Sequence, residues 1–94
     1  MAANEQVVDN REQQRYELNL VGGTAFIDYT DNGNVRTLTH AEVPVRLRGG
    51  GIAAKLTGGA LDLARAKGLK VVPRCPYVAN FIERHPQYQD LVSR

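Results

Sequence analysis

Apolar and polar positions alternate along three stretches in the first half of the chain. The segment 16–20 (YELNL) has apolar residues at every second position, which predicts a strand with one buried face, and 24–30 (TAFIDYT) predicts a second strand. Asn32-Gly33 is a strong signal for a two-residue hairpin turn, because both residue types tolerate positive φ. We therefore expect a third strand over 35–43 (VRTLTHAEV), antiparallel to the second.

The periodicity then changes to that of a helix. Apolar residues recur at three- and four-residue spacing from Ile52 to Leu63, which predicts an amphipathic helix, and Gly68 is placed to end it. Gly58 and Gly59 lie inside this helix, where each costs about 1 kcal/mol relative to Ala. We interpret both glycines as positions where the helix lies close against a sheet.

A short apolar run and a second helical segment complete the chain. The segment 69–72 (LKVV) predicts a buried strand, a helix is expected from Tyr77, and 85–92 forms a short turn or helix. A helix between the third and fourth strands requires a crossover, so these two strands should be parallel. The expected class is α/β (α+β), with the order β-β-β-α-β-α. We expect one domain over 1–94, with the polar segment 1–14 flexible.

Composition narrows the possible functions. The 94 residues carry a net charge of only +2, and the basic residues are interspersed with acidic ones, which argues against a dedicated nucleic-acid surface. No apolar run is long enough to cross a membrane, and the first ten residues lack a secretory leader, so we expect a cytoplasmic protein. The single cysteine, Cys75, cannot form an intrachain disulfide, and no Cys and His framework predicts a metal site.

Three consecutive glycines, Gly49 to Gly51, stand between the third strand and the first helix. Free N–H groups in such a turn, together with the positive end of a helix dipole, suit a phosphate group. A P-loop would need Ser or Thr after Lys55, and Leu56 is there instead. A dinucleotide fingerprint would need an acidic residue about twenty positions later, where Arg74 stands. A tight turn without a ligand remains an alternative.

The glycine segment also resembles a third anion-binding signature. Arg48-x-x-Gly51-x-Ala53 is similar to the Arg/Gln-x-x-Gly-x-Gly/Ala motif of the GNAT (Gcn5-related) superfamily of N-acetyltransferases, and it lies in the expected context between a strand and a helix. The resemblance extends over about 16–92 and is to the miniature single-domain branch of that superfamily. Its supporting segments are THAEVPVRLRGGGIA, ARAKGLKVVPRCPYV and FIERHPQYQDLV.

The resemblance implies an acetyl-CoA site. The loop amides would bind the cofactor pyrophosphate, and Val43 would offer main-chain groups to the pantetheine arm, which would lie between diverging strands over 35–43 and 70–73. Asn80 would be a polar contact to the cofactor, with Arg84 one turn further along the second helix. The loop residues implied are Arg48, Gly49, Gly50, Gly51, Ile52, Ala53 and Ala54.

Three side chains are candidates for the chemistry. His40 and Glu42 share a face of the third strand, and either could accept a proton from an amine; the alternative is a packed strand histidine and a surface carboxylate. Cys75 follows the last strand and could carry the acetyl group, with His40 as its activating base. The alternative for Cys75 is a small apolar side chain that fills the end of a strand. Direct transfer is the first expectation.

We therefore expect an acetyl-CoA-dependent N-acetyltransferase whose acceptor is an amine of a small molecule, peptide or protein. The chain lacks the additional helices and strands that shape the acceptor pocket in typical members, so the site should be open on one side. A monomer or weak homodimer is expected, without nucleic acid or membrane. The alternatives are a non-catalytic CoA-binding or regulatory module and a KH-like RNA-binding domain, although the order of elements argues against the latter.

Overall fold

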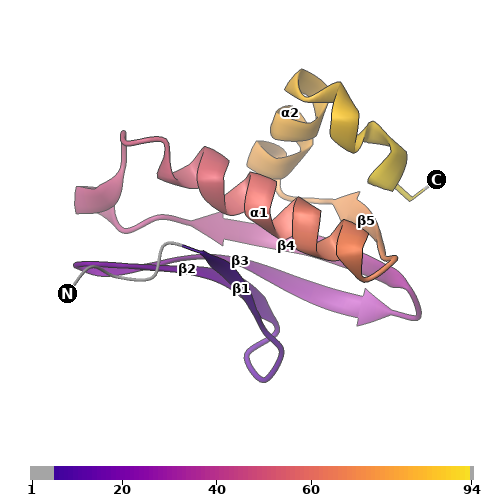
Figure 1. The fold of residues 1–94 in the computed structure, drawn as a ribbon, viewed down its shortest axis with the longest axis horizontal. Coiled ribbons are helices and arrows are strands. Elements are labelled where there is room, and N and C mark those ends of the chain that lie inside the picture. Colours follow the sequence, from indigo (N-terminus) through magenta and orange to yellow (C-terminus); the bar gives the residue numbers. More distant parts are fainter. Residues whose placement is uncertain (1–5, 94) are drawn as a thin grey trace.

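The computed structural model describes residues 6–93, which form one sheet and a layer of helices (Figure 1). The helical segments are two α-helices and two short 3₁₀ helices, η1 and η2. In chain order the elements are β1 (Val7–Asn10), β2 (Arg15–Leu20), β3 (Gly23–Asn32), β4 (Val35–Glu42), η1 (Val45–Leu47), α1 (Ile52–Ala66), β5 (Lys70–Pro73), α2 (Pro76–Arg84) and η2 (Pro86–Leu91).

The sheet has the strand order β1-β2-β3-β4-β5. The first four strands are antiparallel, and α1 connects β4 to β5, which are parallel as predicted. The β3–β4 hairpin is also confirmed, but its turn is shifted by one residue. Asn32 pairs with Val35, so the turn residues are Gly33, with φ of +61°, and Asn34.

The first strand was not predicted, and the expectation of a flexible segment over 1–14 is wrong for its described part. Residues Val7–Asn10 form β1, which pairs with β2 along its whole length. Strand formation here depends on distant partners rather than on local pattern: Val7 packs against Gly59 of α1, and Asp9 binds Arg36 of β4. Residues 1–5 of the predicted flexible segment lie outside the described residues.

Arg36 is the centre of a buried polar network near the first residues of β4. It is 5% exposed and donates hydrogen bonds to both carboxylate oxygens of Asp31, at 2.7 and 2.8 Å. Its Nη1 donates to Asp9 at 2.9 Å and to the hydroxyl of Tyr16 at 3.0 Å. The guanidinium also lies 3.7 Å from the ring centroid of Tyr29. These contacts tie β1 to β2, β3 and β4.

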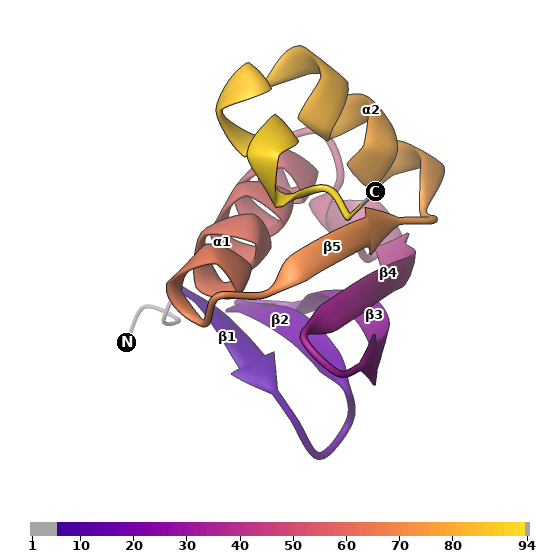
Figure 2. The same ribbon diagram turned by 90° about the vertical axis from the view of Figure 1, so that its right-hand side faces the viewer.

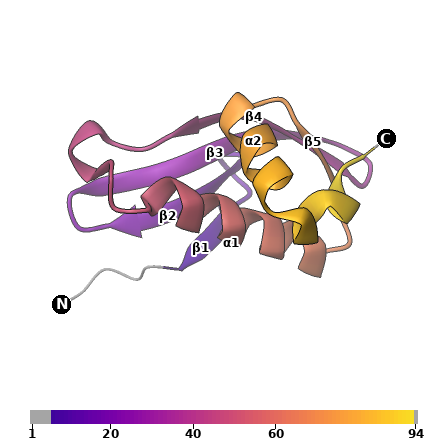
Figure 3. The same ribbon diagram turned by 90° about the horizontal axis from the view of Figure 1, so that it is seen from above.

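The helices cover only one face of the sheet. Figures 2 and 3 show α1, α2 and η2 on the same side of the strands. Between them and the sheet lies the core, whose fully buried large apolar side chains are Tyr16, Leu18, Ile27, Leu38, Leu56, Leu61, Val71 and Val78. A Cβ on Gly59 would lie 2.4 Å from Val7 Cγ2, whereas one on Gly58 would meet nothing closer than 3.7 Å. Close approach to the sheet is therefore confirmed for Gly59 only.

The chain end closes the outer edge of the sheet. Val92 forms a parallel bridge with Val71 of β5, and the N–H of Ser93 donates to the Val71 carbonyl at 2.8 Å. Arg65 of α1 holds the preceding segment through a salt bridge to Asp90 of 2.8 Å. These contacts fix η2 against α1 and hold α2 in place beside the end of β5.

Candidate functional site

The parallel pair of strands opens where β5 ends. β5 pairs with β4 over all four of its residues, up to Leu38 opposite Pro73. The N–H groups of Arg74 and Cys75 then both donate to the Leu38 carbonyl, each at 3.0 Å, as the chain turns into α2. The expected divergence of 35–43 and 70–73 is therefore limited to one end: the strands are paired through Leu38, and Thr39–Glu42 leaves an edge free.

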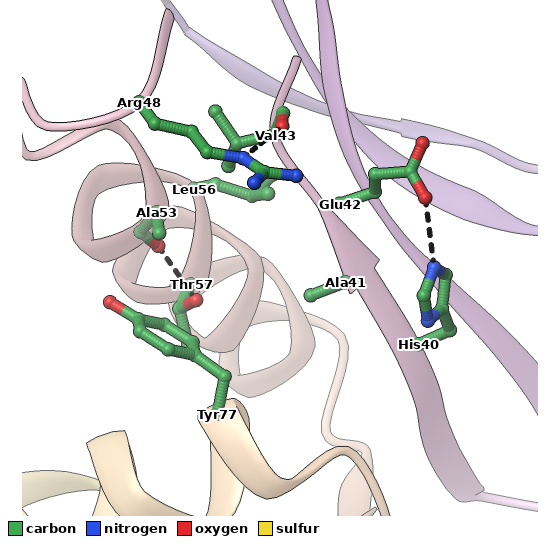
Figure 4. A pocket seen from close by; sticks show the side chains of 9 residues that line it. All are labelled: His40, Ala41, Glu42, Val43, Arg48, Ala53, Leu56, Thr57 and Tyr77. Atoms are coloured by element: carbon green, nitrogen blue, oxygen red, sulfur yellow. Dashed lines mark hydrogen bonds and ion pairs between the residues drawn. The ribbon is translucent and has the colours of Figure 1, made fainter. Parts of the chain in front are cut away.

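A β-bulge at the same place decides which side chains face the helices. Asp28 pairs with His40 while Tyr29 pairs with Leu38, so Thr39 is an extra residue in β4. Regular alternation would have turned His40 and Glu42 to the same side as Leu38. Beyond the bulge Ala41 points toward α1, whereas His40 and Glu42 point to the opposite side of β4 (Figure 4).

A cavity of about 340 Å³ lies between the free edge of β4, α1 and the first turn of α2 (Figure 4). This volume is within the range of small-molecule sites. Most of the side chains directed into it are apolar. Its lining residues are His40, Ala41, Glu42, Val43, Arg48, Ala53, Leu56, Thr57 and Tyr77.

A second cavity, of about 140 Å³, adjoins the first at the glycine turn. Val43, Arg48, Ala53 and Tyr77 line both cavities, so the space continues from the glycines to the free edge of β4. The remaining residues that line the second cavity are Gly49, Gly51, Ile52 and Ala54. Six of the seven predicted loop residues therefore lie at one continuous hollow, and Gly50 stands between two of them in the chain.

The glycine turn exposes main-chain groups at the start of α1. Gly49 and Gly51 have φ of +93° and +76°, a backbone region that side chains with a Cβ rarely adopt. An ideal Cβ on Gly49, Gly50 or Gly51 has no heavy atom within 4 Å, so open space surrounds the turn. No side chain caps the helix N-terminus, which leaves the N–H groups of its first turn available to an anion.

Basic side chains surround this turn without filling it. Arg48 is exposed, and its Nε donates to the Val43 carbonyl at 2.9 Å. Arg46 points toward the β2–β3 turn, where its Nη2 donates to the Gly22 carbonyl at 3.2 Å. Two of the predicted contact groups, Val43 and Arg48, are thus brought together, but the Val43 carbonyl already has a hydrogen-bond partner.

His40 and Glu42 form a pair on the uncovered side of β4, which confirms that they share a face. His40 Nε2 lies 3.2 Å from Glu42 Oε1, and the two side chains are 58% and 55% exposed. The ring of Phe26 lies 6.3 Å from the His40 ring, centroid to centroid. If Nε2 carries the proton that Glu42 accepts, Nδ1 is free to accept another.

Cys75 does not reach the cavities. It is 6% exposed, belongs to the hydrophobic core and occupies the N-cap position of α2. It lines neither cavity, and the His40 side chain points away from the helix layer. The geometry therefore agrees with the packing alternative for Cys75 and gives no support to the acetyl-cysteine hypothesis.

The contribution of α2 to the cavities comes from a residue that sequence reasoning missed. Asn80 and Arg84 are exposed and line neither cavity, whereas Tyr77 is 41% exposed and lines both. The three residues lie three and four positions apart, so they follow one stripe of the helix. The signal that was available is an aromatic residue in the first turn of a helix that begins immediately after the last strand.

Across residues 6–93, no group of three or more His, Cys, Asp or Glu side chains is placed to hold a metal ion. In the same part of the chain, no helix is both long and apolar enough to span a membrane.

The fold and site together define a class of protein. A family model described as GCN5-related N-acetyl-transferase matches residues 15–91. The chain therefore belongs to the GCN5-related N-acetyltransferase family, and the predicted family and fold are confirmed.

Two relatives cover nearly the whole chain. It is 33% identical over 89 residues to protein NATD1 of Gallus gallus, and the match covers 92% of this chain and 81% of that protein. The solution structure of a GCN5-like protein from Staphylococcus aureus has a TM-score of 0.68 at 19% identity, covering 97% of this chain and 90% of that one. At this identity the second likeness supports the fold alone.

Proposed function

We propose that the protein is an acetyl-CoA-dependent N-acetyltransferase that transfers an acetyl group to an amine. One observation carries the proposal. The uncapped, glycine-lined N-terminus of α1 and the free edge of β4 meet at two adjoining cavities, so a long ligand with an anionic end could contact both.

The residues at the hollow fit the parts of CoA. The amides from Gly49 to Ala54 suit the pyrophosphate, and Arg48 can add charge after releasing the Val43 carbonyl. The unpaired main-chain groups of 39–42 suit the amide-bearing pantetheine arm, which would take the place of a missing strand. When bound, acetyl-CoA supplies an acetyl group activated as a thioester.

The pair on the uncovered face is suited to proton transfer. Glu42 accepts a hydrogen bond from His40 Nε2 and fixes the ring so that Nδ1 can take a proton from the acceptor amine. Tyr77 has a hydroxyl at the cavities that bonds to none of the described residues, so it can donate a proton to the leaving thiolate. In this proposal His40 is the base, Glu42 positions it and Tyr77 is the acid.

Direct transfer from cofactor to amine is favoured over an acetyl-cysteine intermediate, because Cys75 is packed in the core and lines neither cavity. Mass spectrometry after incubation with labelled acetyl-CoA tests this choice. The wild type and Cys75→Ala should both remain unlabelled and should acetylate an amine at similar rates. A label that is lost in the variant would establish the covalent route.

Thermal unfolding with and without CoA tests the cofactor. A ligand at 100 times its dissociation constant adds about 2.7 kcal/mol of stability, which raises the Tm measurably. CoA should raise the Tm, and ADP at the same concentration should raise it much less, since ADP cannot contact the edge of β4. Equal shifts with both ligands, or none with either, would contradict the proposed site.

A non-catalytic CoA-binding module remains the second candidate, because both members of the His40–Glu42 pair are more than half exposed. Stabilisation by CoA without acetylation of any amine would favour this module. A KH-like domain is disfavoured by the fold, since the glycine turn here follows four strands and joins η1 to α1.

A further inference from the structure

The uncovered face of the sheet carries a mixed polar and aromatic patch next to the His40–Glu42 pair. By strand register, Phe26 lies opposite Glu42, and Asp28 lies opposite His40. On the other side of β3, Arg15 of β2 lies opposite Asp28. Helices occupy only the other side of the sheet (Figures 2 and 3), so no described helix covers this patch.

Asp28 is a partly buried carboxylate without a partner among the described residues. Arg15 is its direct cross-strand neighbour, a position from which opposite charges normally pair. Instead, Arg15 Nε binds Glu17 Oε2 at 2.6 Å, and its guanidinium lies 4.5 Å from the Phe26 ring centroid. The side chain of Asp28 forms no hydrogen bond or salt bridge with residues 6–93. The Asp28 carboxylate therefore remains available to a cation from outside the chain, although Arg15 is its cross-strand neighbour.

Charge is divided between the two sides of β4. The stretch 44–51, which contains the glycine turn, carries Arg46 and Arg48 and no acidic residue. On the uncovered face, Arg15 is paired with Glu17, which leaves Asp28 and Glu42 as carboxylates beside His40. One side of the strand therefore favours an anion and the other favours a cation.

We propose that this patch, formed by Phe26, Asp28, His40 and Glu42, receives a lysine side chain of a polypeptide acceptor, with Asp28 as its main charge-recognition residue. The inference rests on the proposed function. The ammonium would be drawn to Asp28 and Glu42 and would lose a proton to His40. Overall, the ammonium and the thioester give an amide, a free thiol and one proton, as the C–S bond breaks and the N–C bond forms.

The shape of the face favours a polypeptide over a small amine. Small-molecule sites are concave and enclose most of their ligand, whereas Phe26 and Asp28 line neither cavity and the patch meets the larger cavity only at His40 and Glu42. On the uncovered face, a free amine would contact only the side chains of the patch, of which His40 and Glu42 are more than half exposed. A peptide can extend along the neighbouring rows of β2 and β3 and gain contacts from several residues.

The experiment measures thiol release from acetyl-CoA with three acceptors: a lysine-containing peptide with a blocked N-terminus, the same peptide with norleucine in place of lysine, and a free diamine. Asp28→Asn is compared with Glu12→Gln, which removes one exposed carboxylate from the turn between β1 and β2. Asp28→Asn should raise the KM for the lysine peptide about two- to fivefold, the size expected for one partly exposed ion pair. Glu12→Gln should leave it unchanged.

Further readouts separate this inference from the proposed function. The CoA-dependent Tm shift should be the same in Asp28→Asn and the wild type, and the norleucine peptide should be inactive. Asp28→Asn with an unaltered KM, or a diamine used as efficiently as the lysine peptide, would overturn the acceptor assignment while acetyl transfer stood. Absence of any CoA-dependent Tm shift in the wild type would overturn the proposed function itself.

Discussion

Two arginines at opposite ends of the same strand and its following loop have opposite environments. Arg36 is 5% exposed and makes four hydrogen bonds to side chains. Arg48 is exposed, and its side chain makes one hydrogen bond within residues 6–93, to the main-chain carbonyl of Val43. The first is committed to holding four strands together, whereas the second can exchange its partner for a ligand.

The difference separates two ends of this small domain, one that stabilises the fold and one that leaves polar groups open. At the Arg36 end, buried charges are fully paired and no cavity is needed. At the glycine end, main-chain donors and a basic side chain are left open beside a hollow. Unpaired polar groups are costly where they are buried and harmless where water reaches them, so a site built from open main-chain groups is expected at the exposed end.

Replacement of Arg36 should have the largest effect on stability. Arg36→Met leaves Asp9 and Asp31 without their cation, and breaking a buried ion pair in this way costs about 3–5 kcal/mol. Arg48→Met, at the open end, should change the free energy of unfolding by less than about 0.5 kcal/mol. Urea unfolding of both variants measures this difference. Equal losses would contradict the division between the two ends.

A β-branched side chain in the glycine turn should impair CoA binding, even though open space surrounds the turn. Gly51→Val places a β-branched residue at φ of +76°, which adds about 1–3 kcal/mol of backbone strain and crowds the anion site. The CoA-dependent rise in Tm should disappear. Gly50→Ala, whose Cβ meets open space, is the matched control and should retain most of that rise. Wild-type binding in Gly51→Val would exclude the turn from the site.

The contact between α1 and β1 is also tightly packed. Substitutions there should lower the free energy of unfolding, but by less than the loss of Arg36. Gly59→Ala would bring a Cβ within 2.4 Å of Val7, and overpacking of this kind costs about 1–3 kcal/mol. Helix propensity offsets about 1 kcal/mol of that cost. Gly58→Ala has no such clash and should be neutral or stabilising. Calorimetric Tm values of both variants test the contrast, and Val7→Ala should rescue Gly59→Ala.

The tyrosines of the buried network should also make the stability of the fold depend on pH in the alkaline range. Burial raises the pKa of Tyr29 well above its usual value, and the hydrogen bond to Asp9 raises it further; burial likewise raises the pKa of Tyr16. Folded tyrosines then keep protons that the unfolded chain loses above about pH 10. Stability should be unaffected by these groups below that pH and should fall as the pH rises beyond it. Tyr29→Phe should make this fall less steep in unfolding measured from pH 8 to 11.

Local patterns were sufficient to predict most of the fold. The alternation of 16–20 and 24–30, the helical spacing after Ile52 and the crossover rule gave four of the five strands and their directions. β1 was missed because its four residues have little alternation of their own. They are held by Val7 against α1 and by Asp9 at Arg36, and neither contact can be read from neighbouring residues.

The candidate site was predictable where it consists of main chain and not where it depends on side-chain direction. The glycine signature located the turn at the start of α1 correctly. The pairing of His40 with Glu42 followed from the period of a strand, but the side they face depends on the bulge at Thr39, which leaves no sequence signal. Whether Cys75 or Tyr77 reaches the cavities depends on how α2 packs, which is set by its contacts with η2, α1, β4 and β5.

The extra residue in β4 has a consequence for how this chain can vary in length. Thr39 is the first residue of β4 beyond the part that is paired with β5, and its hydroxyl donates to the Asp28 carbonyl. A deletion there would pull the following loop back along the sheet, and an insertion would push it forward. Natural length differences among close relatives should therefore be frequent in the 11–14 turn and rare between Leu38 and Ala41.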